Sequence, residues 1–70
     1  MEYRYYLLGE RVPIRVAFNE QGLKCGAEAP NRTTGQLEMR HELMSRVEQS
    51  PEVREISKAE FTRRCALTLN

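Results

Sequence analysis

Few residues of this sequence could take part in catalysis or metal binding. His41 is the only histidine, and it falls near the start of an expected helix, at the polar edge of its apolar stripe. A catalytic histidine needs an acid or a thiol beside it, and the sequence indicates no such partner. Glu38 and Glu42 would share one helix face, but Arg46 follows Glu42 at helical spacing and would neutralise it. We therefore interpret all of these residues as exposed surface groups.

The two cysteines, Cys25 and Cys65, are too few for a disulfide framework and lack the spacing of a zinc site. We interpret them as small buried hydrophobic residues; a redox role for either thiol is a weaker alternative. The chain contains no aspartate, which excludes aspartate-rich metal loops, and it has no phosphate-binding glycine loop. The sequence therefore predicts a protein that is not an enzyme, with no catalytic residue, no metal, no cofactor and no small-molecule substrate.

The length and net charge of the chain limit the number of domains and the kinds of partner that we expect. Seventy residues are enough for one domain, which we expect to span residues 1–70. A chain of this size is marginally stable, and it would gain from association with a partner. Eleven basic and ten acidic residues give a net charge of +1, too small for a whole-molecule field that attracts nucleic acid or membranes. Neither a signal peptide nor a membrane span is indicated, so we expect a cytoplasmic protein with no membrane partner.

Hydrophobic alternation predicts three strands in the first thirty residues. Period-two patterns are interpreted as strands over 3–8, where Tyr3, Tyr5 and Leu7 alternate with Arg4, Tyr6 and Leu8, and over 12–18 and 23–29; the segment 12–18 gives the clearest alternation. The segments 9–11 and 19–22 contain the glycine and asparagine typical of turns. A three-stranded antiparallel meander is therefore expected.

A simple register brings the strongest apolar positions onto one face of this meander. Leu7 then lies opposite Ile14, Phe18 lies opposite Leu23, and Val16 lies opposite Cys25. Only Pro13 conflicts with this arrangement, because proline has no N–H group and a central strand needs its N–H groups for pairing. We therefore expect one apolar face, covered by helices, and one face open to solvent.

A first helix is predicted by the apolar stripe that runs from Leu37 to Val47. It should end at Ser50, because the proline that follows disfavours helical geometry at that residue. Arg40 lies in the middle of the stripe, and two explanations stay open. Either the helix begins near Arg40 and residues 37–39 are extended, or the aliphatic stem of Arg40 packs while its charge reaches water.

A second helix is predicted from Lys58. Ser57 and Glu60 have the spacing of a capping box, with Ser57 as the N-cap. Residues 53–56 are expected to form a brief strand before it. The fold class is thus α+β: a three-stranded antiparallel meander, with a short fourth strand as an option, packed on one face by one or two helices in the order β-β-β-α-(β)-α.

The face expected to be open to solvent carries the candidate binding residues Arg4, Tyr6, Arg15 and Lys24. Three cations around a tyrosine suit single-stranded nucleic acid, because cations contact phosphate and an aromatic ring stacks on a base. Alternating basic and aromatic residues are equally typical of an ordinary exposed sheet face. The single aromatic residue and the nearly neutral total charge count against nucleic acid.

Our leading hypothesis is a small protein-interaction or regulatory module. Its partner would be another protein or a second copy of the chain, bound through the open face or an edge strand. Single-stranded nucleic acid is the alternative partner.

Overall fold

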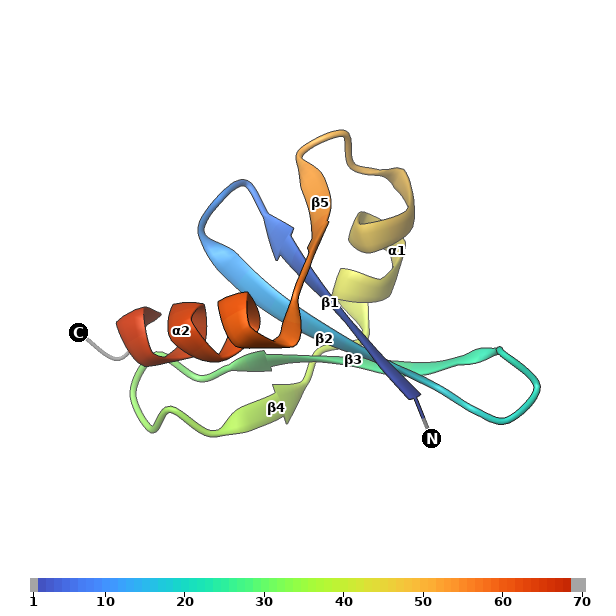
Figure 1. The fold of residues 1–70 in the computed structure, drawn as a ribbon, viewed down its shortest axis with the longest axis horizontal. Helices are drawn as coiled ribbons and strands as arrows, with labels where there is room; N and C mark the ends of the chain where they lie inside the picture. Colours follow the sequence, from blue (N-terminus) through green and yellow to red (C-terminus); the bar gives the residue numbers. More distant parts are fainter. Residues whose placement is uncertain (1, 69–70) are drawn as a thin grey trace.

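The computed structural model describes residues 2–68 and contains a five-stranded antiparallel sheet and two helices (Figure 1). The elements, in chain order, are β1 (Glu2–Leu8), β2 (Val12–Phe18), β3 (Lys24–Pro30), β4 (Leu37–Met39), α1 (Glu42–Gln49), β5 (Val53–Ile56) and α2 (Lys58–Thr68). The strands are arranged in the sheet in the order β4-β3-β2-β1-β5. This is the α+β class expected from the sequence, enlarged by β4.

The turn between β1 and β2 sets the register of the first hairpin. Gly9 and Glu10 both have a φ of 58°, and the Arg11 N–H donates to the Leu8 carbonyl at 3.1 Å. Positive φ at both central residues is what a type I′ turn requires, and glycine adopts it at little cost. The turn places Leu8 opposite Val12. The predicted pairing of Leu7 with Ile14 is therefore wrong by one residue.

This shift of one residue moves every side chain of β1 to the other face of the sheet. Tyr6 lies opposite Ile14, so Tyr6 and Leu8 join the face that carries Ile14, while Tyr5 and Leu7 point to the opposite face. Leu7 is completely buried there, and Leu8 is only 8% exposed. The expectation of a single apolar face was wrong, because the sheet is apolar on both faces.

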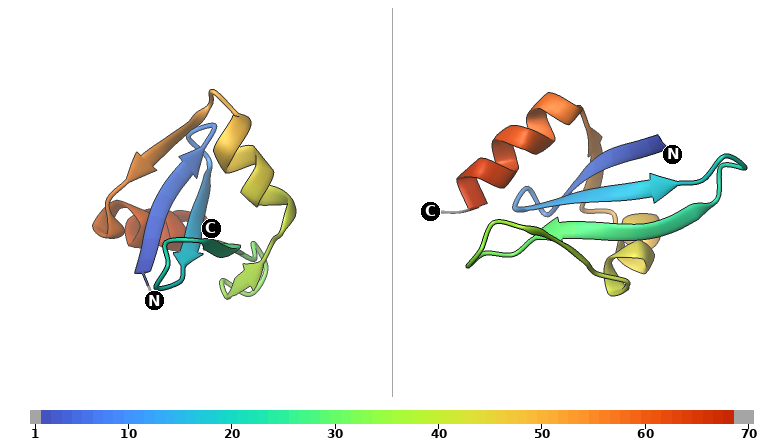
Figure 2. Two further views of the ribbon diagram at one scale, coloured as in Figure 1. Left: turned by 90° about the vertical axis from the view of Figure 1, so that its right-hand side faces the viewer. Right: turned by 90° about the horizontal axis from the view of Figure 1, so that it is seen from below.

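Each face is covered by its own helix (Figure 2). Leu43 of α1 packs in a cluster with Leu8, Ile14, Val16, Ala27 and Ala29. On the other face, Phe61 of α2 packs against Leu7 and Ile56, and the centre of its ring lies 4.9 Å from the centre of the Tyr5 ring. The two helices thus lie on opposite faces instead of sharing one, and each supplies the apolar surface that its face needs.

The second hairpin has a different register from the predicted one, and only Ala27 and Ala29 of β3 keep their predicted inward face, whereas Lys24 lies on the face of Val16 instead of the face of Arg15. Val16 lies opposite Ala27, where the sequence suggested Cys25. A bulge at the end of β2 pairs Phe18 with Lys24 and leaves Cys25 as the extra residue. Cys25 is consequently exposed, and Leu23 is 64% exposed, although both were expected to be buried.

The remaining predictions for the second half agree well with the structure. Residues 37–39 are extended and α1 begins after Arg40, which decides between the two explanations for that residue. The expected strand at 53–56 is β5. The Ser57 hydroxyl accepts a hydrogen bond from the Glu60 N–H at 3.1 Å, as an N-cap does. Among the described residues, no helix has the length and apolarity needed to cross a membrane.

The register can be tested by truncating two leucines. We expect Leu8→Ala to lower the free energy of unfolding by about 2–5 kcal/mol, because it empties a buried position. Leu23→Ala should change it by less than about 0.5 kcal/mol, because Leu23 is largely exposed. Urea denaturation of both variants measures the difference. The register predicted from the sequence alone requires the reverse order, and that result would refute the observed pairing.

Candidate functional site

The structure divides the four candidate residues between the two faces of the sheet. Arg4 lies opposite Val16 and Tyr6 opposite Ile14, and Lys24 shares their face. Arg15 lies on the other face, which α2 covers. The arrangement in which three cations surround Tyr6 is therefore not formed.

All four of these side chains have local partners. Tyr6 is half-buried against the core beneath α1, and the Arg4 guanidinium lies 5.7 Å from the centre of the Phe18 ring. Lys24 forms an ion pair with Glu48 of α1.

Arg15 donates to the Glu28 carboxylate at 2.8 Å, and its guanidinium lies 4.5 Å from the centre of the Tyr3 ring. The contacts of Arg4 and Arg15 link neighbouring strands, and the ion pair of Lys24 links β3 to α1. An open aromatic platform for a base would require an exposed ring, which Tyr6 does not provide.

The residues that could carry out chemistry are dispersed. His41 is exposed at the start of α1, Glu38 accepts a hydrogen bond from the Asn31 amide, and Glu42 pairs with Arg40. Within residues 2–68, no group of three or more histidine, cysteine or acidic side chains is placed to hold a metal ion.

A different site appears at the end of the sheet that carries the β1–β2 turn and the β3–β4 loop. A hollow of about 350 Å³ lies there, and we refer to it as the arginine pocket. It is lined by five aliphatic or proline side chains, one asparagine and four arginines: Leu8, Val12, Ala29, Pro30, Leu43, Asn31, Arg11, Arg32, Arg40 and Arg46. The arginines come from four separate segments of the chain.

The fold explains why these arginines meet. Successive turns of a meander alternate between its two ends, so Arg11 in the β1–β2 turn and Arg32 in the β3–β4 loop lie at the same end. Arg40 joins β4 to α1, and Arg46 lies in α1. Because α1 packs over the face that carries Leu8, it brings Arg46 to the same hollow.

The charge of the arginine pocket is not balanced by its lining, which contains no acidic residue. Arg40 donates to the Glu42 carboxylate and lowers the pKa of that carboxyl from its ordinary value of 4.5. Glu42 is therefore ionised at neutral pH and holds Arg40. Within the part of the chain that the structure describes, Arg11, Arg32 and Arg46 have no ion-pair partner.

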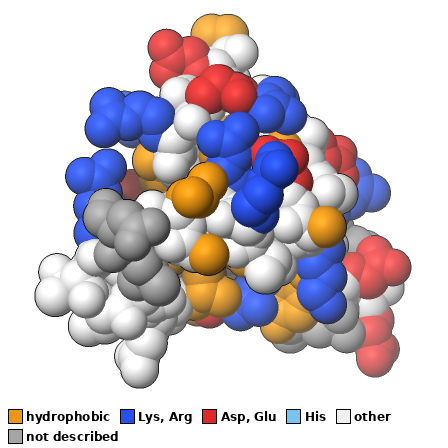
Figure 3. All heavy atoms as spheres, turned by 60° about the vertical axis from the view of Figure 1, so that its left-hand side comes forward, with side chains coloured by type: hydrophobic (Ala, Val, Ile, Leu, Met, Phe, Trp, Pro, Cys, Tyr) orange, Lys and Arg blue, Asp and Glu red, His pale blue; other side chains and the backbone are white. Residues whose placement is uncertain are grey.

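The floor of the arginine pocket is aliphatic. Leu8, Ala29 and Leu43 belong to the buried core and are at most 8% exposed. Cations that surround an apolar floor attract an anion more strongly than the same cations spread over an open surface, because low-dielectric walls focus their field. Figure 3, which brings this end of the sheet forward, shows several basic side chains on this surface, interspersed with carboxylates.

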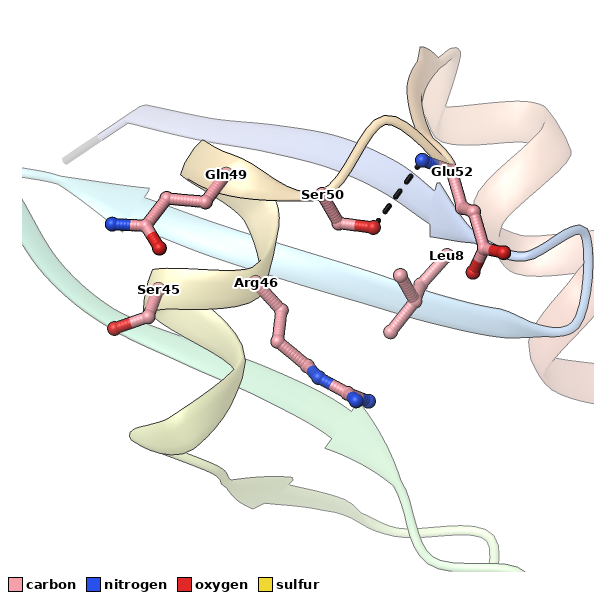
Figure 4. A pocket seen from close by; sticks show the side chains of 6 residues that line it. All are labelled: Leu8, Ser45, Arg46, Gln49, Ser50 and Glu52. Carbon is pink, nitrogen blue, oxygen red and sulfur yellow. Dashed lines mark hydrogen bonds between the residues drawn. The ribbon is translucent and has the colours of Figure 1, made fainter.

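A second hollow, of about 300 Å³, adjoins the arginine pocket and shares Leu8 and Arg46 with it. Its other lining residues are polar: Ser45, Gln49, Ser50 and Glu52. Figure 4 shows Arg46 extending from α1 and Leu8 from β1 into the same space, with the Glu52 carboxylate beside Leu8. We refer to this hollow as the Glu52 hollow.

Three of the four pocket arginines carry no signal that marks them in the sequence. Arg11, Arg32 and Arg46 are ordinary charged residues of a turn, a loop and a helix. Arg40 alone stood out, because it interrupts an apolar stripe. The shared end of Arg11 and Arg32 follows from the predicted three-stranded meander, because its third strand ends at the same end of the sheet as the turn between its first two strands.

The two cysteines should differ in reactivity. The Cys25 thiol is exposed, whereas burial of Cys65 against the cluster beneath α2 raises the pKa of its thiol, and the nearby Arg15 opposes this only in part. Because the thiolate is the reactive form, we expect a disulfide reagent to modify Cys25 faster than Cys65 at pH 8. The variant Cys25→Ser should lose the fast phase, and Cys65→Ser the slow one. Equal rates for both thiols would contradict the described burial.

No protein-family model, curated protein or solved structure matches this chain. Functional inference therefore rests on the geometry of the arginine pocket and its surroundings.

Proposed function

We propose that this protein is a non-enzymatic binding module that recognises an acidic segment of a protein partner through the arginine pocket. The observation that carries the proposal is the collection of four arginines around one hollow without an acidic residue in its lining. The whole chain has a net charge of only +1, so this local excess of positive charge is not a consequence of overall composition.

Stability offers a poor explanation for this arrangement. Like charges gathered at one place repel each other, and ion pairs would be the ordinary way to offset that repulsion. Three of the four arginines make no such pair among residues 2–68. Outside the pocket, Arg15, Arg54 and Arg63 each contact a glutamate, and Arg4 lies over the Phe18 ring. An external anion would supply the partners that the pocket arginines lack.

Guanidinium groups suit this task. Each presents a planar fork of N–H donors that matches the two oxygens of a carboxylate, and such charge-assisted hydrogen bonds are stronger than neutral ones. A ligand with several carboxylates could engage more than one arginine. The aliphatic floor at Leu8, Ala29 and Leu43 would contact the methylene groups of acidic side chains.

The lining also favours a protein partner over single-stranded nucleic acid. Stacking on aromatic rings supplies about 1–3 kcal/mol per base in nucleic-acid binders, and no aromatic residue lines either hollow. Tyr6 is half-buried, and Arg15 lies on the opposite face of the sheet. A nucleic acid would be held here by its phosphates alone, without contacts that select single strands.

The non-enzymatic part of the proposal is supported by what the pocket lining offers. Acyl or phosphoryl transfer needs a nucleophile or a general base next to the bound anion. The only uncharged polar side chain in the lining is Asn31, whose Oδ1 accepts hydrogen bonds from the N–H groups of Thr33 and Thr34. Binding is the activity that these groups support.

Binding of a fluorescein-labelled hexaglutamate peptide, followed by fluorescence anisotropy, tests the proposal. We expect saturable binding at low salt that weakens as salt is raised. The variants Arg32→Gln and Arg46→Gln should each weaken binding by about tenfold, because each removes one charge-assisted contact.

Arg63→Gln is the matched control, since Arg63 is an exposed arginine of α2 outside both hollows. It removes the same charge and should change affinity by less than about twofold, in line with non-specific screening alone. The proposal fails if Arg63→Gln weakens binding as much as Arg46→Gln. It also fails if a labelled oligothymidine of equal charge binds more tightly than the peptide.

A further inference from the structure

We infer that the arginine pocket is built for a phosphorylated serine or threonine of the partner, and that the Glu52 hollow selects a basic residue flanking it. This inference rests on the proposed function and names its ligand more closely. It follows from the number of unpaired cations, the shape of the site and the position of one carboxylate.

The number of unpaired cations matches a phosphate better than a carboxylate. Arg40 is already held by Glu42, which leaves Arg11, Arg32 and Arg46 without a charged partner among residues 2–68. A phosphorylated side chain carries about −1.5 to −2 charges at neutral pH and three acceptor oxygens, whereas a carboxylate carries one charge and two oxygens. One phosphate can therefore occupy several guanidinium forks at once, which one carboxylate cannot do.

The pocket suits a phosphate that is attached to a short side chain. Its volume of about 350 Å³ exceeds what a single phosphate needs, and its floor is aliphatic. The Cβ of phosphoserine, or the methyl group of phosphothreonine, would contact Leu8 and Leu43 while the phosphate oxygens face the arginines at the rim. A bare inorganic phosphate would gain nothing from that floor.

The neighbouring Glu52 hollow adds a group of opposite charge. Both backbone polar groups of Glu52 are hydrogen-bonded: its N–H donates to the Ser50 hydroxyl at 3.2 Å, and its carbonyl accepts from the Gly9 N–H at 3.1 Å. The Glu52 carboxylate lies over the β1–β2 turn. Its Oε2 atom would be 3.7 Å from a Cβ atom at position 9, which glycine does not have.

The Glu52 carboxylate makes no ion pair within residues 2–68. Because the two hollows share Leu8 and Arg46, a chain anchored by its phosphate can place a neighbouring side chain beside Glu52. A lysine or arginine there would be attracted, and a glutamate would be repelled. Among the anionic segments that the arginine pocket can bind, the Glu52 hollow thus favours one with a basic residue next to the anion.

Four peptides of otherwise identical sequence test this inference by isothermal titration calorimetry. They carry phosphoserine flanked by lysine, phosphoserine flanked by glutamate, glutamate in place of phosphoserine, and unmodified serine. We expect the first to bind at least about tenfold more tightly than the glutamate peptide, because it engages one more guanidinium. The serine peptide should not bind measurably.

Substitutions in the protein test which residue causes the preference for phosphate and which causes the preference for a flanking lysine. Arg32→Gln should weaken the phosphoserine peptides by about tenfold. Glu52→Gln should leave the requirement for phosphate intact while it abolishes the preference for flanking lysine over glutamate. Arg63→Gln serves as the control and should alter neither preference.

The outcomes separate this inference from the proposed function. Equal binding of the phosphoserine and glutamate peptides would overturn the assignment of phosphate and leave an acidic-segment module standing. Failure of every anionic peptide to bind would overturn the proposed function itself. An unchanged lysine preference in Glu52→Gln would refute the role of the Glu52 hollow alone.

Discussion

The tight turn at Gly9 and Glu10 is the constraint on which the rest of the structure depends. Both residues have a φ of 58°, and the Arg11 N–H donates to the Leu8 carbonyl, which closes the turn and places Leu8 opposite Val12. Glutamate in this conformation is unfavourable, and its side chain is held from outside the turn. Arg54 of β5 binds the Glu10 carboxylate through two nitrogens and lowers the pKa of that carboxyl, with a smaller contribution from Arg64 of α2. The turn is thereby tied to the last strand and the last helix.

The one-residue register that follows from this turn gives β1 two apolar faces, and each face requires a helix. Leu7 is buried beneath α2 and Leu8 beneath α1. With α1 fixed on the Leu8 face, Arg46 reaches the end of the sheet where Arg11 and Arg32 already lie. The arginine pocket is thus a consequence of the same register that builds the core, and its floor consists of core residues. A shift of one residue would point Leu8 away from α1 and remove that floor.

Much of the fold could be predicted from the sequence, because its local signals were consistent. The alternation of β2, the turn chemistry at 19–22 and the Ser57 cap each indicated one structure, and each is present. The register of β1 could not be predicted, because Tyr5, Tyr6, Leu7 and Leu8 are apolar on both sides of the strand. Strands buried on both faces lose the alternation that marks the inner side. The predicted single apolar face failed for this reason.

The site was less accessible to sequence reasoning than the fold. The expected cluster around Tyr6 depended on a register, and one residue of error placed Arg15 on the other face. The arginine pocket depends on contacts between segments that are distant in the chain, so no pattern of residue spacing within one segment predicts it. Only the combination of turn positions, strand order and helix placement brings its residues together.

The most direct test of the account is an NMR titration that follows the arginine Nε–Hε signals while inorganic phosphate is added at constant ionic strength. We expect the signals of Arg11, Arg32 and Arg46 to shift together along one saturable curve, while the signal of Arg63 remains unchanged. Shifts that are equal for all arginines, or that never saturate, would show that these side chains form no shared anion site and would contradict the account.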